Sequence, residues 1–553
     1  MTVRGHVPTG RARQVVSLCL AAVLLYVVLI APNHPAALSL WALSVVPLEW
    51  PVIVLVLLAL PPKGGATVVV RVLLCLGLVA ITLLKLADFL TFLAYNRGFN
   101  PVVDWHLVIA AWHLGSGVLG TVMAVVAVIA LVGAIGLLAY SLWWATGRFA
   151  RISLPVPLPL WVSAATVPFA LFAAAEVGHS MRHWQLPFDP PGAAFTARVG
   201  VERVAMVQET VAGLRAFRAA AATDPFAETA PLLDQIGDRD VLVIYVESYG
   251  SSSLTNPRYR PTHLETLQRM EAELSAKGLG LRSGWLEAPM IGGQSWLSHA
   301  TLAQGLWIPD QKTYGAALAS GRKSLFHLAQ DAGFRTSAVM PAITMDWPEA
   351  NFMGFDRVLP AAQLGYRGLA FNWVTMPDQF TLSALERLVL RGDAAKDRAP
   401  VFAQIALISS HAPWTPVPTL LDWDALGDGR VFNDMAVSGD PPDVVWRDHD
   451  RVRDQFRQAI DYSLRTVGEF AGRQAEAAPL MVILGDHQPA RFVSQNDSFT
   501  VPVHIVGPPA LVDRFAAWGW PDGLVPDKNA RTWRMDAFRD RFLTTFSSGA
   551  TSP

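Results

Sequence analysis

The sequence predicts a two-part protein: a helical membrane region followed by an α/β domain with a mainly parallel sheet flanked by helices. Apolar residues make up 52% of the 553 residues and charged residues only 16%, and most of the apolar excess lies before about residue 180. That first part contains five long apolar stretches. From about residue 238 onward, short apolar runs alternate with helical patterns, as in α/β domains.

The apolar stretches are long enough to span a membrane, because about 20 residues cross a hydrocarbon core of roughly 30 Å. We expect the spans at 14–32, 38–60, 66–94, 117–145 and 155–177, within a transmembrane region covering residues 1–178. The segment 103–114 is too short and mixed to span, and we expect an interfacial helix there. It contains Trp105, His106, Trp112 and His113.

Basic residues in the short loops predict the orientation of the spans. One side carries Arg4, Arg11, Arg13, Lys63, Arg148 and Arg151, and the other has Arg97 alone among its short loops. This bias predicts a bacterial-type cytoplasmic (inner) membrane protein with a cytoplasmic N-terminus and everything beyond residue 178 outside. A cleaved signal peptide is the alternative for the first span, but no convincing cleavage site follows it.

The second part of the chain has no cysteine for a disulfide or a thiolate metal site, because Cys19 and Cys75 both lie in predicted spans. Its stability must therefore come from burial of a core. The net charge is −1, and lysines and arginines form no stripe interleaved with aromatic residues. Nucleic acid is not an expected partner.

Residues 179–237 form the expected connector, within which the Ala-rich stretch 198–222 should be an amphipathic helix lying along the membrane face. The exported domain is expected over 238–548. Its apolar runs suit central strands buried on both faces; they lie at 241–246, 336–339, 402–408 and 480–484. Helical patterns lie between them, at 264–277, 323–331 and 451–473.

Polar side chains follow three of these runs, at the sheet edge where ligands bind in open α/β sheets. Glu247 follows the first run, His411 the third, and Asp486 and His487 the fourth. Carboxylates mixed with imidazole suit Zn²⁺ or Mn²⁺, with Mg²⁺ as a further option. Each residue alone has a structural alternative, such as capping a helix. Asp486 and His487 are adjacent, so shared ligation needs a turn, which Gly485 permits.

Ser295 is the candidate nucleophile. It follows Gly292-Gly293-Gln294 and opens a helical run through Gln304. Glycines let the backbone approach a phosphate, and the positive end of a helix favours an anion and an ionised hydroxyl. A bound metal would lower the pKa of the hydroxyl further. The alternative is that Ser295 only caps the helix.

Together these segments resemble membrane-embedded lipoteichoic acid synthases and related phosphoglycerol and phosphoethanolamine transferases of the sulfatase-like, alkaline phosphatase superfamily. The matching pieces are Val-Glu-Ser-Tyr-Gly at 246–250, Gly-Gln-Ser at 293–295, Ser-Ser-His-Ala-Pro-Trp at 409–414 and Gly-Asp-His at 485–487. The resemblance implies an alkaline phosphatase-like fold. It also implies a two-step reaction, in which a phospholipid donor gives its head group to the nucleophile and an extracytoplasmic glycan or lipid acceptor collects it.

The same resemblance assigns roles to individual residues. It makes Glu247, Asp486, His487 and Ser295 the ligands of one divalent metal, with Ser295 also the nucleophile. Substrate contacts are implied for Trp347, which would pack on the head group, for Gln294, and for His411, which would contact the phosphate or donate a proton. His299 and His504 are secondary candidates; a structural role is the alternative for His504, which lies in an apolar run.

The chain departs from the family pattern in three places. The usual threonine nucleophile is Ser295, which keeps the hydroxyl but loses the methyl group that fixes its rotamer. An arginine expected two residues after Trp347 is Glu349, which puts a phosphoglycerol substrate in doubt. After Gly-Asp-His, no further histidine occurs before His504. Sulfate-ester hydrolysis is disfavoured, because the proline and arginine of true sulfatases do not follow Ser295.

Other functions stay open at this point. The same chemistry with water as acceptor would make the chain a phosphodiesterase or phosphatase. An inactive binding domain is a further alternative, and a transporter has little support from five short-looped spans. Lys85, Asp88, Arg97 and Asp104 are costly charges in or near the spans. They would grip a lipid head group, dock the soluble domain or form structural pairs.

Overall fold

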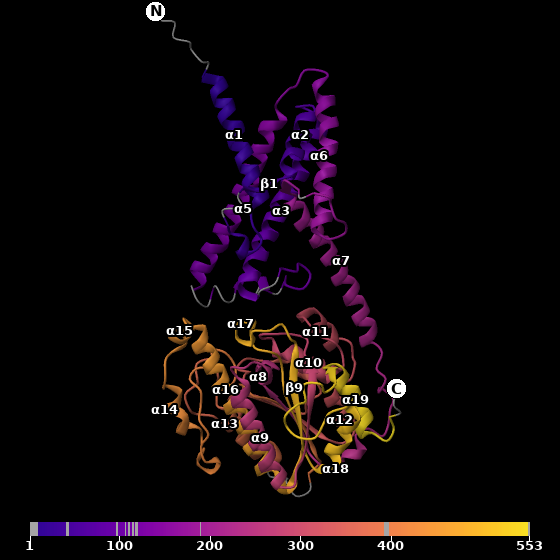
Figure 1. The fold of residues 1–553 in the computed structure, drawn as a ribbon, viewed down its shortest axis with the longest axis vertical. Coiled ribbons are helices and arrows are strands. Elements are labelled where there is room, and N and C mark those ends of the chain that lie inside the picture. Colours follow the sequence, from indigo (N-terminus) through magenta and orange to yellow (C-terminus); the bar gives the residue numbers. More distant parts are fainter. Residues whose placement is uncertain are drawn as a thin grey trace, which may run out of the picture. The chain divides into compact units, whose positions relative to one another are not determined.

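The computed structural model describes residues 9–550 except 40–43, 96–97, 106, 109–110, 113–115, 117–119, 189 and 392–397. It consists of two compact units, Met1–Gly213 and Leu214–Pro553, the first helical and the second α/β (Figure 1). Arg4, Arg97, His106 and His113 lie outside the described residues. The interfacial helix expected at 103–114 therefore stays a prediction.

Among the described residues of the first unit, four helices are long and apolar enough to cross a membrane. They are α1 (Thr9–Ile30), α3 (Gly65–Tyr95), α5 (Thr121–Ala150) and α6 (Leu158–Ser180). Their outward side chains are apolar too: Leu90, Ile129 and Leu171, for example, are exposed. A helix that is apolar all round suits a bilayer rather than water, so four of the five predicted stretches have the expected form.

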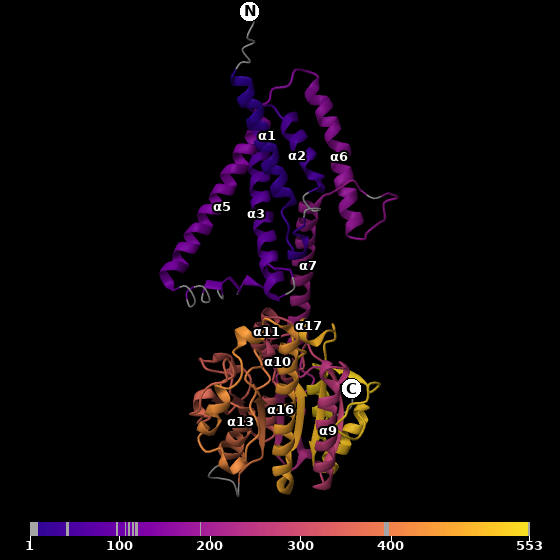
Figure 2. The ribbon, with the colours of Figure 1, turned by 60° about the vertical axis from the view of Figure 1, so that its left-hand side comes forward.

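The stretch 38–60 does not form the single long helix that we expected. Strand β1 (Val46–Pro47) pairs in parallel with β2 (Gly192–Ala193), and helix α2 extends only over Glu49–Ala59. Its 11 residues rise about 16 Å, which is shorter than a hydrocarbon core. Pro47 accounts for the late start, because a proline disfavours the helical conformation of the residue before it. Helix α2 packs against α6 and α5 within the bundle (Figure 2).

The connector helix α7 (Phe195–Ala221) begins inside the first unit. Lys85 Nζ on α3 donates to Thr196 Oγ1 on α7 at 2.8 Å, and Arg203 on α7 pairs with Asp88 on α3 at 2.5 Å. These buried charged groups of α3 contact α7. The first turns of α7 therefore run beside α3 (Figure 2), and the expectation of a helix lying along the membrane face stays a prediction.

The second unit is built on an eight-stranded sheet with the order β10-β4-β9-β8-β3-β7-β5-β6. The strands are β3 (Val241–Val246), β4 (Gly280–Glu287), β5 (Arg335–Met340), β6 (Arg357–Pro360), β7 (Val401–Ala406), β8 (Leu480–Gly485), β9 (Thr500–Gly507) and β10 (Thr532–Arg534). Only β9 runs antiparallel to its neighbours, β8 and β4. The sheet is therefore mainly parallel, as predicted.

Helices cover both faces of this sheet. One face carries α9 (Arg260–Ala276), α13 (Asp378–Leu385) and α16 (His449–Arg473); the other carries α10 (Ser295–Gln304), α12 (Leu325–Asp331) and α19 (Ala537–Phe546). Shorter helices lie in the connections: α8 (Ser252–Thr255), α11 (Gln311–Leu318), α14 (Asn433–Ala436), α15 (Pro442–Val445), α17 (Arg491–Ser494) and α18 (Pro509–Val512). The predicted helices at 264–277, 323–331 and 451–473 correspond to α9, α12 and α16.

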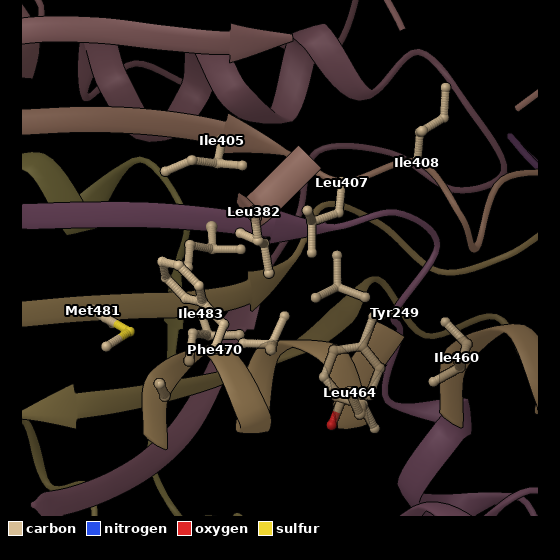
Figure 3. Packing of buried hydrophobic residues seen from close by; sticks show 14 of the residues in the cluster. Tyr249, Leu382, Ile405, Leu407, Ile408, Ile460, Leu464, Phe470, Met481 and Ile483 are labelled. Atoms are coloured by element: carbon tan, nitrogen blue, oxygen red, sulfur yellow. The ribbon is translucent and has the colours of Figure 1, made fainter. Parts of the chain in front are cut away.

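The central strand β3 is buried along its whole length. Successive side chains of a strand point to opposite faces of the sheet. Leu242, Ile244 and Val246 accordingly join the core under α9, α13 and α16, and Val241, Val243 and Tyr245 join the core under α10, α12 and α19. Figure 3 shows the first of these cores, where side chains of β7 and β8 meet those of α13 and α16.

Candidate active site

The candidate site lies at the carboxyl edge of the sheet, where β3 stands between β8 and β7. All three strands are parallel, so they end at the same edge. Glu247 follows β3, His411 lies a few residues after β7, and Asp486 and His487 follow β8. The topology thus brings together segments that are far apart in the sequence.

Glu247, Asp486 and His487 form a buried group whose ligand atoms all lie within 4.8 Å of one another. His487 Nε2 is 3.3 Å from Glu247 Oε1 and 3.9 Å from Asp486 Oδ1. His487 Nδ1 is hydrogen-bonded to the Gln488 carbonyl oxygen at 2.8 Å, which leaves Nε2 facing the two carboxylates. We call these three residues the acidic cluster.

The turn that lets adjacent Asp486 and His487 share one site is held by the backbone. Asp486 Oδ1 accepts hydrogen bonds from the amides of His487, at 2.7 Å, and Ser248, at 2.8 Å. Gly485 allows the strands to approach here, because a Cβ atom at this position would lie 1.8 Å from the Tyr249 carbonyl oxygen. The requirement for glycine is therefore one of space.

Ser295 joins the acidic cluster from a fourth segment. Its Oγ donates to Glu247 Oε2 at 2.8 Å and lies 3.1 Å from His487 Nε2. Ser295 is the first residue of α10, and the N-cap position belongs to Gln294, which has a left-handed backbone with φ of 63°. Ser295 is therefore not the N-cap residue of α10, and its hydroxyl faces the acidic cluster.

The charges of the acidic cluster fit a divalent cation. Burial and the neighbouring Glu247 raise the pKa of Asp486. Burial would also raise the pKa of Glu247, but the charge and hydrogen bond of His487 outweigh it and hold that pKa well below its usual range. The single charge of His487 cannot offset two buried carboxylates, so a divalent cation would relieve the remaining cost. Two carboxylates, an imidazole nitrogen and a hydroxyl oxygen are a donor set that Zn²⁺ or Mn²⁺ accepts.

The loop after β7 is fixed from two sides. The carboxylate of buried Asp378 accepts hydrogen bonds from the amides of Ile408 and Ser409, both at 2.8 Å, and Ser410 Oγ donates to the Glu247 carbonyl oxygen at 2.6 Å. His411 is half-buried, and its Nδ1 is hydrogen-bonded to the Ala412 carbonyl oxygen at 2.5 Å. The charge of His411 lies close enough to Glu247 to lower the pKa of that carboxyl group.

A cavity of about 240 Å³ begins at Trp296, the residue that follows Ser295. Trp296 and His299, from the first turns of α10, line it together with Trp347 and Glu349. Its wall also includes Tyr314, from α11, and Gln404, from β7, which sequence reasoning missed. Gln404 had a signal, because it is the single polar residue in an otherwise apolar run; Tyr314 had none.

The two secondary histidines lie in different surroundings. His299 is buried, its ring centroid is 4.0 Å from that of Tyr245, and burial lowers its pKa to about 3. Its Nε2 has no hydrogen-bond partner among the described residues. His504 bonds instead to the hydroxyl of Tyr249 at 3.1 Å, and burial lowers its pKa to about 4. His504 lies outside the acidic cluster, and its structural role stays a prediction.

Comparison with known proteins gives likeness to solved structures only. No family model and no curated protein matches the chain. The lipoteichoic acid synthase LtaP from Listeria monocytogenes has 12% identity, covers 61% of this chain and 78% of its own, and has a TM-score of 0.39. The phosphoglycerol transferase GacH from Streptococcus pyogenes has 13% identity, with coverages of 62% and 82% and a TM-score of 0.37.

The integral membrane lipooligosaccharide phosphoethanolamine transferase A (EptA) from Neisseria meningitidis is similar over both units. Its identity is 12%, it covers 97% of this chain and 96% of its own, and its TM-score is 0.41. These three structures are of the kinds of enzyme that the sequence motifs resemble. Identities this low do not carry an activity from one protein to another, so the function proposed below rests on the site.

Proposed function

We propose that the chain is a membrane-anchored, metal-dependent transferase. It moves a phosphate-linked head group, of the phosphoglycerol or phosphoethanolamine type, from a phospholipid to an extracytoplasmic glycan or lipid acceptor through a covalent intermediate on Ser295. One observation carries the proposal. The Ser295 hydroxyl lies 2.8 Å from Glu247 and 3.1 Å from His487, inside a group of three side chains suited to a metal.

In the proposed mechanism the reaction consists of two successive displacements at phosphorus. A divalent ion held by Glu247, Asp486 and His487 would lower the pKa of the Ser295 hydroxyl and offset phosphate charge. Ser295 loses its proton to solvent, and its Oγ attacks phosphorus while the amides at the start of α10 face the phosphate. The bond from phosphorus to the diacylglycerol oxygen breaks, and that oxygen takes a proton from His411. An acceptor hydroxyl then returns a proton to His411 and attacks phosphorus. The bond from phosphorus to Ser295 Oγ breaks, and Oγ takes back a proton from solvent.

Exposed apolar side chains support a lipid donor. In the second unit the large exposed apolar residues include Trp296, Met345, Phe352 and Trp373, with 42%, 83%, 57% and 79% of their surface accessible. All four lie in segments that follow the carboxyl ends of β4, β5 or β6. Exposed apolar groups at the sheet edge that carries the site fit lipid chains better than water. The apolar helices of the first unit confine the enzyme to the same bilayer as such a donor, at high effective concentration.

Labelling of Ser295 tests the proposal. The purified full chain with Mn²⁺ is incubated with phospholipid carrying a labelled head group, and the modified peptide is identified by mass spectrometry. We expect label on wild type and on Ser295→Thr, which keeps the hydroxyl, and none on Ser295→Ala. Ser298→Ala is the matched control, because Ser298 is on the same helix and its Oγ has no hydrogen-bond partner among the described residues. An unlabelled wild type would refute the proposal.

The fate of the label distinguishes transfer from hydrolysis. Transfer predicts that the head group leaves Ser295 only when a hydroxyl-bearing glycan or lipid is added. Release of free head-group phosphate to water, with no modified acceptor, would make the chain a phosphodiesterase instead. That outcome would support Ser295 as the nucleophile and contradict transfer to a glycan or lipid acceptor.

A further inference from the structure

The cavity beside Ser295 has an aromatic wall. Trp296, Tyr314 and Trp347 all line it. Trp296 is held in place by a hydrogen bond from its Nε1 to Gln311 Oε1 at 3.0 Å, and Tyr314 is buried. Faces of tryptophan and tyrosine rings attract cations through their quadrupoles. The wall thus suits a positively charged group.

Two acceptors in the cavity wall, the Gln404 amide oxygen and the Glu349 carboxylate, suit a ligand that brings a donor. Gln404 is only 1% exposed, yet its Oε1 has no hydrogen-bond partner among the described residues, and its amide nitrogen lies 3.8 Å from Met340 Sδ. A buried amide oxygen left without a donor costs free energy, which a ligand N–H group would recover. Glu349 adds a carboxylate close enough to Tyr314 to act on its phenol electrostatically.

The cavity wall contains no competing positive charge. Among its described residues, none is lysine or arginine. An anionic head group would therefore meet the Glu349 carboxylate without a counter-charge, and an uncharged polyol would gain nothing from the aromatic faces. A quaternary ammonium would meet the aromatic faces but has no N–H for Gln404. A protonated primary amine satisfies the rings, the carboxylate and the unpaired amide oxygen together.

We propose that Glu349 is the specificity-determining residue of this site and that the cavity selects a phospholipid head group bearing a protonated primary amine. This inference rests on the proposed function, because it places the amine in the cavity while the phosphorus is at Ser295. The amine makes contacts only; no bond to nitrogen forms or breaks.

Competing donors test the inference on the full chain with Mn²⁺. Vesicles of one inert carrier lipid contain equal amounts of phosphatidylethanolamine and phosphatidylglycerol with identical acyl chains, and the mass of the modified Ser295 peptide reports which head group was transferred. We expect ethanolamine to exceed glycerol by roughly tenfold or more, as for charge-assisted recognition of a polar group. Glu349→Gln should reduce this ratio by about tenfold, and Glu349→Lys should favour glycerol.

Controls separate this inference from the proposed function. Glu287→Gln removes an exposed carboxylate at the end of β4, outside the cavity, and should leave the ratio unchanged. Glycerol transfer exceeding ethanolamine transfer, or an unchanged ratio in Glu349→Gln, would overturn the inference while labelled Ser295 upholds the proposed function. Phosphatidylcholine reacting as fast as phosphatidylethanolamine would overturn the requirement for N–H groups. No label from any of the three lipids would refute both.

Discussion

Asp378 holds the loop that carries His411, so its removal should weaken both the fold and the reaction. Its buried carboxylate accepts hydrogen bonds from the amides of Ile408 and Ser409 at 2.8 Å and from the Ser463 hydroxyl at 2.7 Å. Alanine at this position leaves these donors without an acceptor. Each unsatisfied buried donor costs about 1–3 kcal/mol. The hydroxyl can rotate to another acceptor, so the two amides dominate, and we expect Asp378→Ala to lose roughly 2–6 kcal/mol.

The unfolding temperature of the full chain in detergent measures the first effect, and the rate of Ser295 labelling measures the second. We expect the temperature to fall by roughly 5–15 °C and the rate to fall by about tenfold or more as His411 loses its place. Asp378→Asn keeps an acceptor oxygen for both amides and should recover most of each loss. Asp331→Ala, an exposed carboxylate, should change stability by less than about 0.5 kcal/mol. Equal damage from asparagine and alanine would refute the reasoning.

Three further predictions concern the metal, the first unit and the strand ends. Removal of metal by a chelator should lower the unfolding temperature of wild type, since a bound metal at 100 times its Kd stabilises the fold by about 2.7 kcal/mol. The unfolding temperature of Asp486→Asn should not respond to the chelator. An equal fall in both proteins would count against the metal site. Arg203→Ala should destabilise by about 3–5 kcal/mol, because it removes the counter-charge of the buried Asp88 carboxylate. The double variant with Asp88→Ala should recover stability in thermal unfolding, and additive losses would contradict the pair. Gly485→Ala should abolish Ser295 labelling, since its Cβ atom would meet a carbonyl oxygen at 1.8 Å; retained labelling would show that the strand ends can separate.

The buried centre of the α/β domain could be predicted from sequence because its strands are continuous apolar runs. Strand β3 begins and ends where we expected, and β8 extends one residue further. Strand β4 was missed because it carries Arg282 and Ser283. The charge of Arg282 is matched by Asp522 at 2.5 Å and Asp513 at 3.8 Å, both far along the chain. The edge strands β6 and β10 are too short to give a pattern.

Site residues could be predicted from the sequence where they follow a strand. Those that meet only through tertiary packing could not. Glu247 follows one apolar run directly and Asp486 follows another after Gly485, so their convergence followed from parallel topology. Gln404 and Tyr314 come from different elements, and only the folded chain shows that they share a cavity. The partners of Lys85 and Asp88 were hidden for the same reason, since they lie 111 and 115 residues away.

The alternation along β3 limits how this protein can change during evolution. A single inserted or deleted residue within Val241–Val246 would exchange the side chains of the two cores and turn Glu247 toward the wrong face of the sheet. Loops at the far edge of the sheet carry no such constraint and can grow or shrink freely. Descendants of this gene should therefore keep the length of this strand while accumulating insertions between the elements.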